Sequence, residues 1–411
     1  MDETNDSTIS SKTAIVVIHG MGNQYPMETI TDFVDNLFKI EENKDKDDNP
    51  KSIYSAPERI TGSFDQRKLI GFHNNVQYDC YEYYWAHLIK EPSVSDTISW
   101  MYKLIWKKEP SERLNKYISI IRRSSIGLLL LISIIIFFYY WLFTWIISCC
   151  PLWSRLFFFI VSVVAFYKLR NIFRLLTQSF GDVIRYTVPH PSNIEGRQRI
   201  SNIAVDFLTN LHDKDYSRIV IVGHSLGSII AYEMLINTFG NLNKLFKNVE
   251  GLEEKDTEEL LEGSKEESFN KMQDLGWKWK VTDFITCGSP LCHAEMILTK
   301  NKDLFKNKKE LGEYPVSEPI KDVSKLFYLN KKTKKYIPTH YSVFKYVEWN
   351  NIHFENDIIG GKLRALFGQD IHDHPPIKPK TFKRILESHT HYWNKNQEVE
   401  SFNIIDNIIK R

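Results

Sequence analysis

The stretch IVIVGHSLGSIIAY (residues 219–232) places a serine, Ser225, between two glycines at the end of an apolar run. Residues 217–222 are rich in β-branched side chains and predict a buried strand, and residues 229–239 have the apolar spacing of a helix. A sharp turn between them would bring the two backbones so close that only glycine fits at Gly223 and Gly227. The pattern therefore predicts that Ser225 stands above a sheet edge at a helix N-terminus, where unpaired N–H groups favour negative charge.

A serine in this position is typical of nucleophilic catalysis. A free hydroxyl is a weak nucleophile at neutral pH, so it needs a rigid, exposed position and a base within hydrogen-bond reach. The motif G-x-S-x-G also arises by chance, but here it follows a strand pattern and opens a helix pattern, as the catalytic turn requires. We expect Ser225 to be the nucleophile.

The composition excludes several classes of function. Lys and Arg number 53 against 51 Asp and Glu, a formal net charge of +2, which offers no field that would favour nucleic acid. The 5 cysteines are odd in number and scattered, which indicates a reduced, cytosol-facing protein rather than a zinc site or a disulfide scaffold. The first residues, MDETNDSTISSKT, lack a basic or apolar region and predict no secretory signal.

A long uncharged segment, residues 124–154, indicates a membrane. A helix over 126–147 would be about 33 Å long, enough to cross a hydrocarbon core of about 30 Å. A second apolar run, 156–167, reaches only about 18 Å, and Pro151 would break the helix between them. We expect a transmembrane or re-entrant helical hairpin at 121–175, with a hydrophobic cap on a soluble core as the alternative.

Basic residues stand at both outer ends of the hairpin, which by the positive-inside rule places both ends in the cytoplasm. They are Arg122, Arg123, Lys168, Arg170 and Arg174. We expect residues 1–120 and 176–411 to form the two parts of one catalytic domain facing the cytoplasm, interrupted by the hairpin. Charged insertions at 241–275 and 300–335 are expected at the surface, the first as a solvated insertion or, in a functional reading, a mobile lid.

The remaining pattern predicts alternating strands and helices, and so an α/β fold. The expected strands cover 13–18, 75–85, 217–222, 281–287 and 343–349, and the expected helices cover 27–40, 200–211, 229–239 and 402–409.

Several motifs together resemble the serine α/β-hydrolase superfamily. IVIVGHSLGSIIAYEML is similar to the nucleophile elbow of lipases and esterases, VVIHGMGNQ to their oxyanion turn, and TDFITCGSPL to the strand after the nucleophile helix. WNNIHFENDIIGG resembles the acid loop and SHTHYW the histidine loop of lipase-like members. The resemblance covers residues 13–23 and about 180–411. It implies an α/β-hydrolase fold, a mostly parallel sheet with helices on both faces, into which the hydrophobic hairpin is inserted.

The order of catalytic residues in that family is Ser, then Asp or Glu, then His. Ser225, Asp357 and His389 satisfy it, with Asp357 in a polar loop after a predicted strand, where it could orient an imidazole. His389 would carry the serine proton. In similar sequences the histidine stands four places before the tryptophan of a Tyr-Trp pair, so Trp393 favours His389, and His391 is the alternative base.

Other acidic residues and histidines compete for these roles. Asp370 and Asp373 are rival acids, and Asp283 is less suitable because it enters a strand. His372 and His374 flank an aspartate, but this set is too small to predict zinc. We expect no metal and no cofactor.

An oxyanion intermediate needs two main-chain donors. The N–H groups of Leu226 and Met21 are the candidates. Gly20 would let the backbone approach, and His19 would brace the turn. His224 is expected to pack beside the nucleophile.

These expectations describe a membrane-associated serine hydrolase that cleaves a carboxylic ester, expected to be a lipid acyl ester, through an acyl-enzyme. Four alternatives stay open: an acyltransferase with the same triad, a catalytically inert membrane-anchored scaffold, a soluble esterase with an apolar cap, and a membrane-disrupting toxin.

Overall fold

A computed structural model describes residues 11–21, 25–38, 53–59, 67–88, 191–245, 251–299, 301–319, 322–378, 389–393 and 399–411, with six single helical residues between 160 and 187. The chain forms two compact units, Met1–Ile89 with Pro189–Arg411, and Lys90–Val188. The hairpin predicted at 121–175 lies outside the described residues except for Ile160, Val163 and Tyr167. Among the described helices, none has the length and apolar character needed to cross a membrane.

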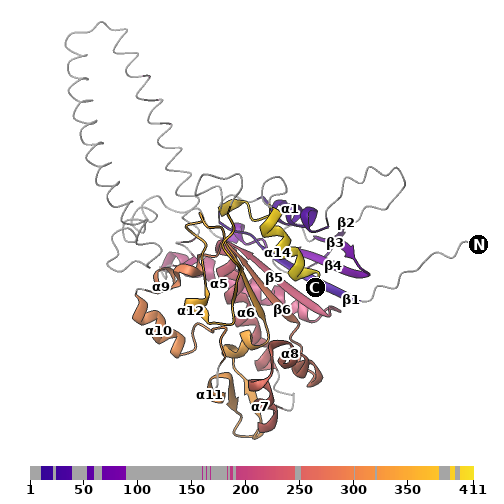
Figure 1. Cartoon of the computed structure of the whole chain (residues 1–411), viewed down its shortest axis with the longest axis vertical. Coiled ribbons are helices and arrows are strands. Elements are labelled where there is room, and N and C mark those ends of the chain that lie inside the picture. Colours follow the sequence, from indigo (N-terminus) through magenta and orange to yellow (C-terminus); the bar gives the residue numbers. More distant parts are fainter. Residues whose placement is uncertain are drawn as a thin grey trace, which may run out of the picture. The chain divides into compact units, whose positions relative to one another are not determined.

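The first unit is built on an eight-stranded sheet with the order β10-β9-β6-β5-β1-β4-β3-β2 (Figure 1). All neighbouring strands pair in parallel except β3, which is antiparallel to both β4 and β2. The strands are β1 (Ser11–Ile18), β2 (Ile53–Pro57), β3 (Arg67–His73), β4 (Val76–Glu82), β5 (Arg218–His224), β6 (Val281–Cys287), β9 (Glu348–Ile352) and β10 (His372–Asp373). A separate small hairpin joins β7 (Phe327–Leu329) to β8 (Tyr336–Pro338). The fold is therefore α/β with a mostly parallel central sheet.

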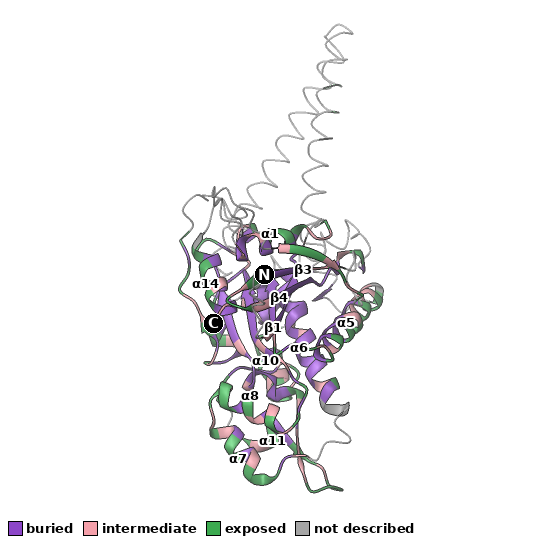
Figure 2. Ribbon diagram, turned by 90° about the vertical axis from the view of Figure 1, so that its right-hand side faces the viewer, coloured by how far each residue is buried: buried purple, intermediate pink, exposed green. Residues whose placement is uncertain are grey.

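Helices cover both faces of this sheet (Figures 1 and 2). On one face α1 (Glu28–Leu37) and α14 (Val399–Ile409) pack in a core with side chains such as Ile15, Val17 and Val220. Because successive strand residues point to opposite faces, the alternate side chains meet α5 (Pro191–His212) and α6 (Leu226–Leu245). Aromatic contacts mark this second core, for example Tyr81 with Phe207 of α5.

Short helices fill the connections outside these layers. They are η1 (Ala86–Leu88), α7 (Glu254–Glu262), α8 (Lys265–Asp274), η3 (Pro290–His293), α9 (Ala294–Ile297), α10 (Lys302–Glu310), α11 (Val323–Leu326), η4 (His340–Lys345) and α12 (Arg364–Phe367).

Two predicted segments take a more specific form in the structure. The charged insertion at 241–275, expected at the surface, contains α7 and α8. Each begins with a capping box, which satisfies free N–H groups at its start and stabilises a short polar helix. The strand predicted at 343–349 begins only at residue 348, because residues 340–345 form the short helix η4. The side chain of Thr339 caps the start of η4.

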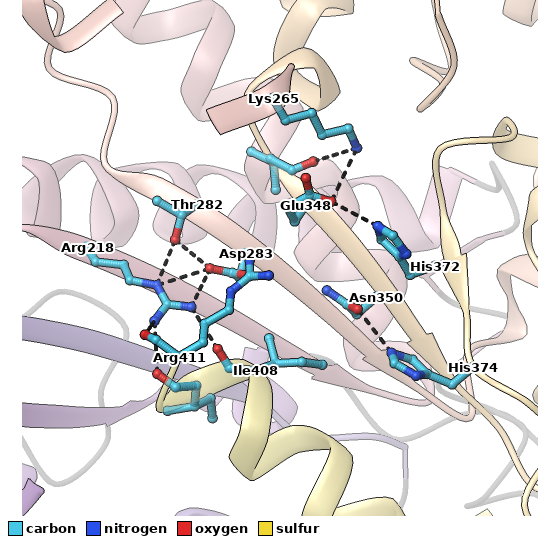
Figure 3. A network of polar contacts seen from close by, with 12 residues as sticks. Arg218, Lys265, Thr282, Asp283, Glu348, Asn350, His372, His374, Ile408 and Arg411 are labelled. Atoms are coloured by element: carbon cyan, nitrogen blue, oxygen red, sulfur yellow. Dashed lines mark hydrogen bonds and ion pairs between the residues drawn. The ribbon is translucent and has the colours of Figure 1, made fainter. Parts of the chain in front are cut away.

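A partly buried arginine joins the sheet to the last helix (Figure 3). Arg218, at the start of β5, donates hydrogen bonds of 2.9 Å to the carbonyl oxygens of Ile408 and Ile409. It also forms an ion pair of 2.6 Å with the fully buried carboxylate of Asp283 in β6, which Arg411 contacts from its other side. The guanidinium thereby satisfies the free carbonyls at the end of α14 and neutralises a buried charge.

Replacing this arginine should destabilise the fold strongly. In Arg218→Met, Asp283 keeps only the Thr282 hydroxyl and Arg411 among the partners in this network, and two helix carbonyls lose their donor. We therefore expect a loss of about 3 kcal/mol in the free energy of unfolding. Arg197→Met removes a more exposed pair with Glu233 and should cost under about 1 kcal/mol. Urea unfolding of both variants measures the difference, and equal losses would contradict the role given to Arg218.

Candidate active site

The predicted site residues lie on loops at one edge of the sheet. Ser225 directly follows β5, Gly20 follows β1, Gly288 follows β6 and Asp357 follows β9. These four strands are parallel neighbours, so their carboxyl ends meet at the same edge. After β1 the chain builds β2, β3 and β4 on one side of this strand and then crosses to its other side to build β5 and the later strands. Ligand sites of open α/β sheets lie at such a switch point in strand order.

The turn at Ser225 is strained and tightly packed. Ser225 has a φ of 50°, a left-handed conformation that non-glycine residues seldom adopt. Its N–H donates to the carbonyl of Cys287 at 3.0 Å, and its own carbonyl accepts from Ser228 at 2.9 Å. A Cβ on Gly227 would lie 2.3 Å from the carbonyl oxygen of Ile18. The close approach of the two backbones thus requires glycine and holds Ser225 in its conformation.

Three side chains distant in sequence converge at this turn. The hydroxyl Oγ of Ser225 lies 2.7 Å from Nε2 of His389, and Nδ1 of the same ring lies 2.9 Å from Oδ2 of Asp357. All three residues are at least 95% buried. This is the order of contacts that a hydroxyl nucleophile, a general base and an orienting carboxylate require.

The hydrogen-bond partners assign the protons. Asp357 accepts the main-chain N–H of Ile359 on Oδ1 at 2.8 Å, and the hydroxyl of Tyr392 on Oδ2 at 2.8 Å. Burial by itself raises the pKa of Asp357, but the hydrogen bonds from His389 and Tyr392 outweigh it and hold the pKa below its usual range. The carboxylate is therefore ionised and accepts Nδ1–H of His389, which leaves Nε2 free to accept the proton of Ser225.

The loop carrying His389 is fixed by buried contacts on both sides. Nε2 of His224 donates to the carbonyl of His389 at 2.7 Å, and burial lowers the pKa of His224 to about 3. The main chain of Trp393 accepts from the side chain of Asn36 in α1, and its ring meets Phe33 edge to face. His389 is thus held by the same core that covers the sheet.

Of the two residues predicted as oxyanion donors, Leu226 directly follows the nucleophile and Met21 directly follows a glycine that packs against it. Leu226 is the first residue of α6, where an N–H group has no acceptor within the helix. A Cβ on Gly20 would lie 2.9 Å from Cβ of Ser225, so the turn that continues to Met21 passes directly against the nucleophile. His19 is fully buried, stacks on Trp85 and has a pKa lowered to about 4 by burial.

The rival residues have other partners. His391 lies 2.9 Å from the hydroxyl of Thr390. Asp373 accepts main-chain N–H groups at the start of α12, and Asp283 holds Arg218 near the other end of β6. His372 lies beside Glu348, and His374 beside Asn350 (Figure 3). Within the described residues no group of three His, Cys, Asp or Glu side chains could hold a metal ion.

Two residues of the site were not predicted from the sequence. Gly288 has a φ of 57°, and a Cβ there would lie 2.9 Å from Oδ2 of Asp357. Tyr392 contacts the same oxygen. The sequence did carry a signal for each, a glycine directly after a strand and a tyrosine three residues from the histidine, but neither signal indicates contact with the carboxylate.

Buried histidines should make the fold sensitive to acid. Burial lowers the pKa values of His19 and His212 to about 4 and that of His224 to about 3. The folded chain keeps these rings neutral, whereas the unfolded chain protonates them below about pH 6.5. The unfolded state then binds more protons, so the free energy of unfolding should fall between pH 6.5 and 4, by up to about 1.4 kcal/mol per pH unit for each ring.

Urea unfolding between pH 7.5 and 4.5 measures this slope. His212 is the last residue of α5 and lies outside the site. His212→Asn removes one titrating ring, so the slope of the free energy of unfolding against pH should fall by up to about 1.4 kcal/mol per pH unit, the contribution of one proton. A slope that the substitution leaves unchanged would contradict the assignment of His212 as a neutral ring.

Comparisons of this chain with protein-family models, with curated proteins and with solved structures found no match. The chemistry of the site must therefore be inferred from its own residues and geometry.

Proposed function

We propose that this protein is a serine hydrolase with the α/β-hydrolase fold, and that it cleaves carboxylic esters through an acyl-enzyme. The observation that carries the proposal is the alignment of Ser225 Oγ, the His389 ring and the Asp357 carboxylate through hydrogen bonds of 2.7 and 2.9 Å. Its position supports the proposal, because the serine occupies a strained strand-to-helix turn at the carboxyl ends of parallel strands.

In the proposed reaction Ser225 Oγ attacks the ester carbonyl carbon while its proton moves to Nε2 of His389. The tetrahedral intermediate collapses as the carbon–oxygen bond to the alcohol breaks, and His389 gives the alcohol that proton. Water then attacks the acyl-enzyme by the same route and releases the carboxylic acid. Asp357 stays ionised throughout and stabilises the imidazolium.

The main chain would stabilise the negative oxygen of the intermediate. The N–H of Leu226 stands at the N-terminus of α6, where the helix dipole favours negative charge. Met21 follows the glycine that packs against Ser225. Together these two N–H groups form the proposed oxyanion hole, and loss of one such donor typically lowers turnover about 100- to 1,000-fold.

We further propose a lipid acyl ester as the substrate and a membrane hairpin at 121–175 as the anchor, with the catalytic domain on the cytoplasmic side. The uncharged segment 124–154 supports this. So do Ile160, Val163 and Tyr167, large side chains at helical spacing that are 52%, 50% and 62% exposed. Such exposure suits contact with an apolar phase.

A fluorophosphonate probe tests the hydrolase proposal, because it reacts only with an activated serine. We expect covalent labelling of the wild-type chain, its loss in Ser225→Ala, and a rate at least about 100-fold lower in His389→Ala, since the base is absent. Ser217→Ala is the control, because this hydroxyl bonds the main chain of Lys12 and should label normally. Labelling that survives Ser225→Ala would refute the assignment of the nucleophile.

Product analysis tests the substrate class. Membranes incubated with the active chain should release free fatty acid, and membranes incubated with Ser225→Ala should not. Added acceptor alcohols would divert the acyl group to new esters if the chain is a transferase. Identical lipid profiles from the two chains would rule out a lipid ester as the substrate.

A further inference from the structure

We propose that Tyr392 is a positioning residue of the site: its hydroxyl donates to Asp357 and limits how strongly that carboxylate attracts the proton of His389. The inference rests on the proposed function and adds a fourth side chain to the three that carry it. Tyr392 would act only through Asp357, and not by contact with the reacting atoms.

The donors and acceptors fix the direction of the bond. The hydroxyl oxygen of Tyr392 accepts the main-chain N–H of Phe354 at 3.2 Å. An N–H group can only donate, so the single phenolic proton is left to point toward Asp357. It reaches Oδ2 at 2.8 Å, the same oxygen that lies 2.9 Å from Nδ1 of His389.

Packing holds the ring in this orientation. Tyr392 is 1% exposed, and its ring centroid lies 4.5 Å from that of Phe354. On its other side a Cβ on Gly288 would come within 2.7 Å of the ring edge. Ser401 of α14 donates to the carbonyl of Tyr392 at 2.8 Å. Burial and contacts with Phe354 and Gly288 thus hold the ring, and with it the position of the hydroxyl.

The shared oxygen gives the hydroxyl a measurable effect. A carboxylate oxygen that accepts hydrogen bonds from two donors shares its negative charge between them. Each donor therefore weakens the attraction of the carboxylate for the other donor. Removing the phenol takes one donor from Oδ2 and so strengthens the attraction of that oxygen for His389, while the main-chain N–H groups of Ile359 and Gly360 still hold the carboxylate. The imidazolium should therefore form at higher pH in a phenylalanine variant.

Three buried titratable groups that adjoin the pair, His224, Cys287 and Tyr392, keep one charge state in the assay range of pH 5 to 9. The ring of His224, 5.2 Å from that of His389, has a pKa lowered to about 3 by burial. Burial raises the pKa of Cys287, at the end of β6, and raises that of Tyr392 itself well above 10. A change in the pH profile would therefore report on the pair of His389 and Asp357.

The test compares Tyr392→Phe with Tyr216→Phe. Tyr216 is a matched control, because its buried hydroxyl donates at 2.7 Å to another buried carboxylate, Asp79, outside the site. We expect the midpoint of the acid limb of fluorophosphonate labelling to move upward by about 0.5 to 1 pH unit in Tyr392→Phe. Tyr216→Phe should lower the unfolding midpoint and leave the pH profile unchanged.

A second measurement does not depend on hydrolase activity. In a Ser225→Ala background, NMR of 15N-labelled histidine follows protonation of His389 directly, and its midpoint should also move upward in Tyr392→Phe. An unchanged or lower midpoint would overturn the role of Tyr392. A wild-type chain that fluorophosphonate never labels would instead refute the proposed function, and the NMR titration would still decide the inference.

Discussion

The close approach of two backbones, at the end of β1 and the start of α6, is the constraint on which the rest of the site depends. Gly227 lies so near the carbonyl of Ile18 that no side chain fits between them, and a Cβ on Gly20 would lie only 2.9 Å from Cβ of Ser225. This contact forces the chain to turn within one residue, which places Ser225 at a φ of 50°. Such strain costs about 1 to 3 kcal/mol and persists only where the surroundings over-determine it. Here strong packing on both sides of the turn supplies that stability.

A second dependence links the charge of Asp357 to the hydrophobic core. A buried carboxylate is costly unless donors surround it, and Asp357 has donors from its own loop and from the loop of His389 and Tyr392. That second loop is anchored by Trp393 against Phe33 of α1. The packing of α1 and α14 therefore positions the base as well as covering the sheet. A mutation in this core would change the geometry of the site without touching Ser225.

Local patterns were sufficient for part of this architecture. The β-branched runs before Ser225 and His19 predicted β5 and β1, because buried parallel strands are continuous apolar segments. The last two strands at one side of the sheet, β3 and β2, were not predicted, since their half-exposed sequences carry little periodicity. At the site, motifs indicated the serine, the acid and the histidine one at a time. Contacts between residues far apart in sequence, such as Tyr392 with Asp357, depend on the packed fold, so they have no local signal.

The topology also bears on how the second unit is inserted into the first. The second unit, residues 90–188, is inserted into the first unit after β4. Since β4 is parallel to β1, it ends at the sheet edge where Ser225 lies. Trp85, shortly before the exit, donates to the carbonyl of His19 at 3.0 Å. The chain returns at the start of α5, where Gly196 lies near the carbonyl of Leu88. The two stretches of the first unit that flank residues 90–188 therefore lie close together. An insertion between them leaves the order and pairing of the strands unchanged, because all eight strands of the central sheet lie outside residues 90–188.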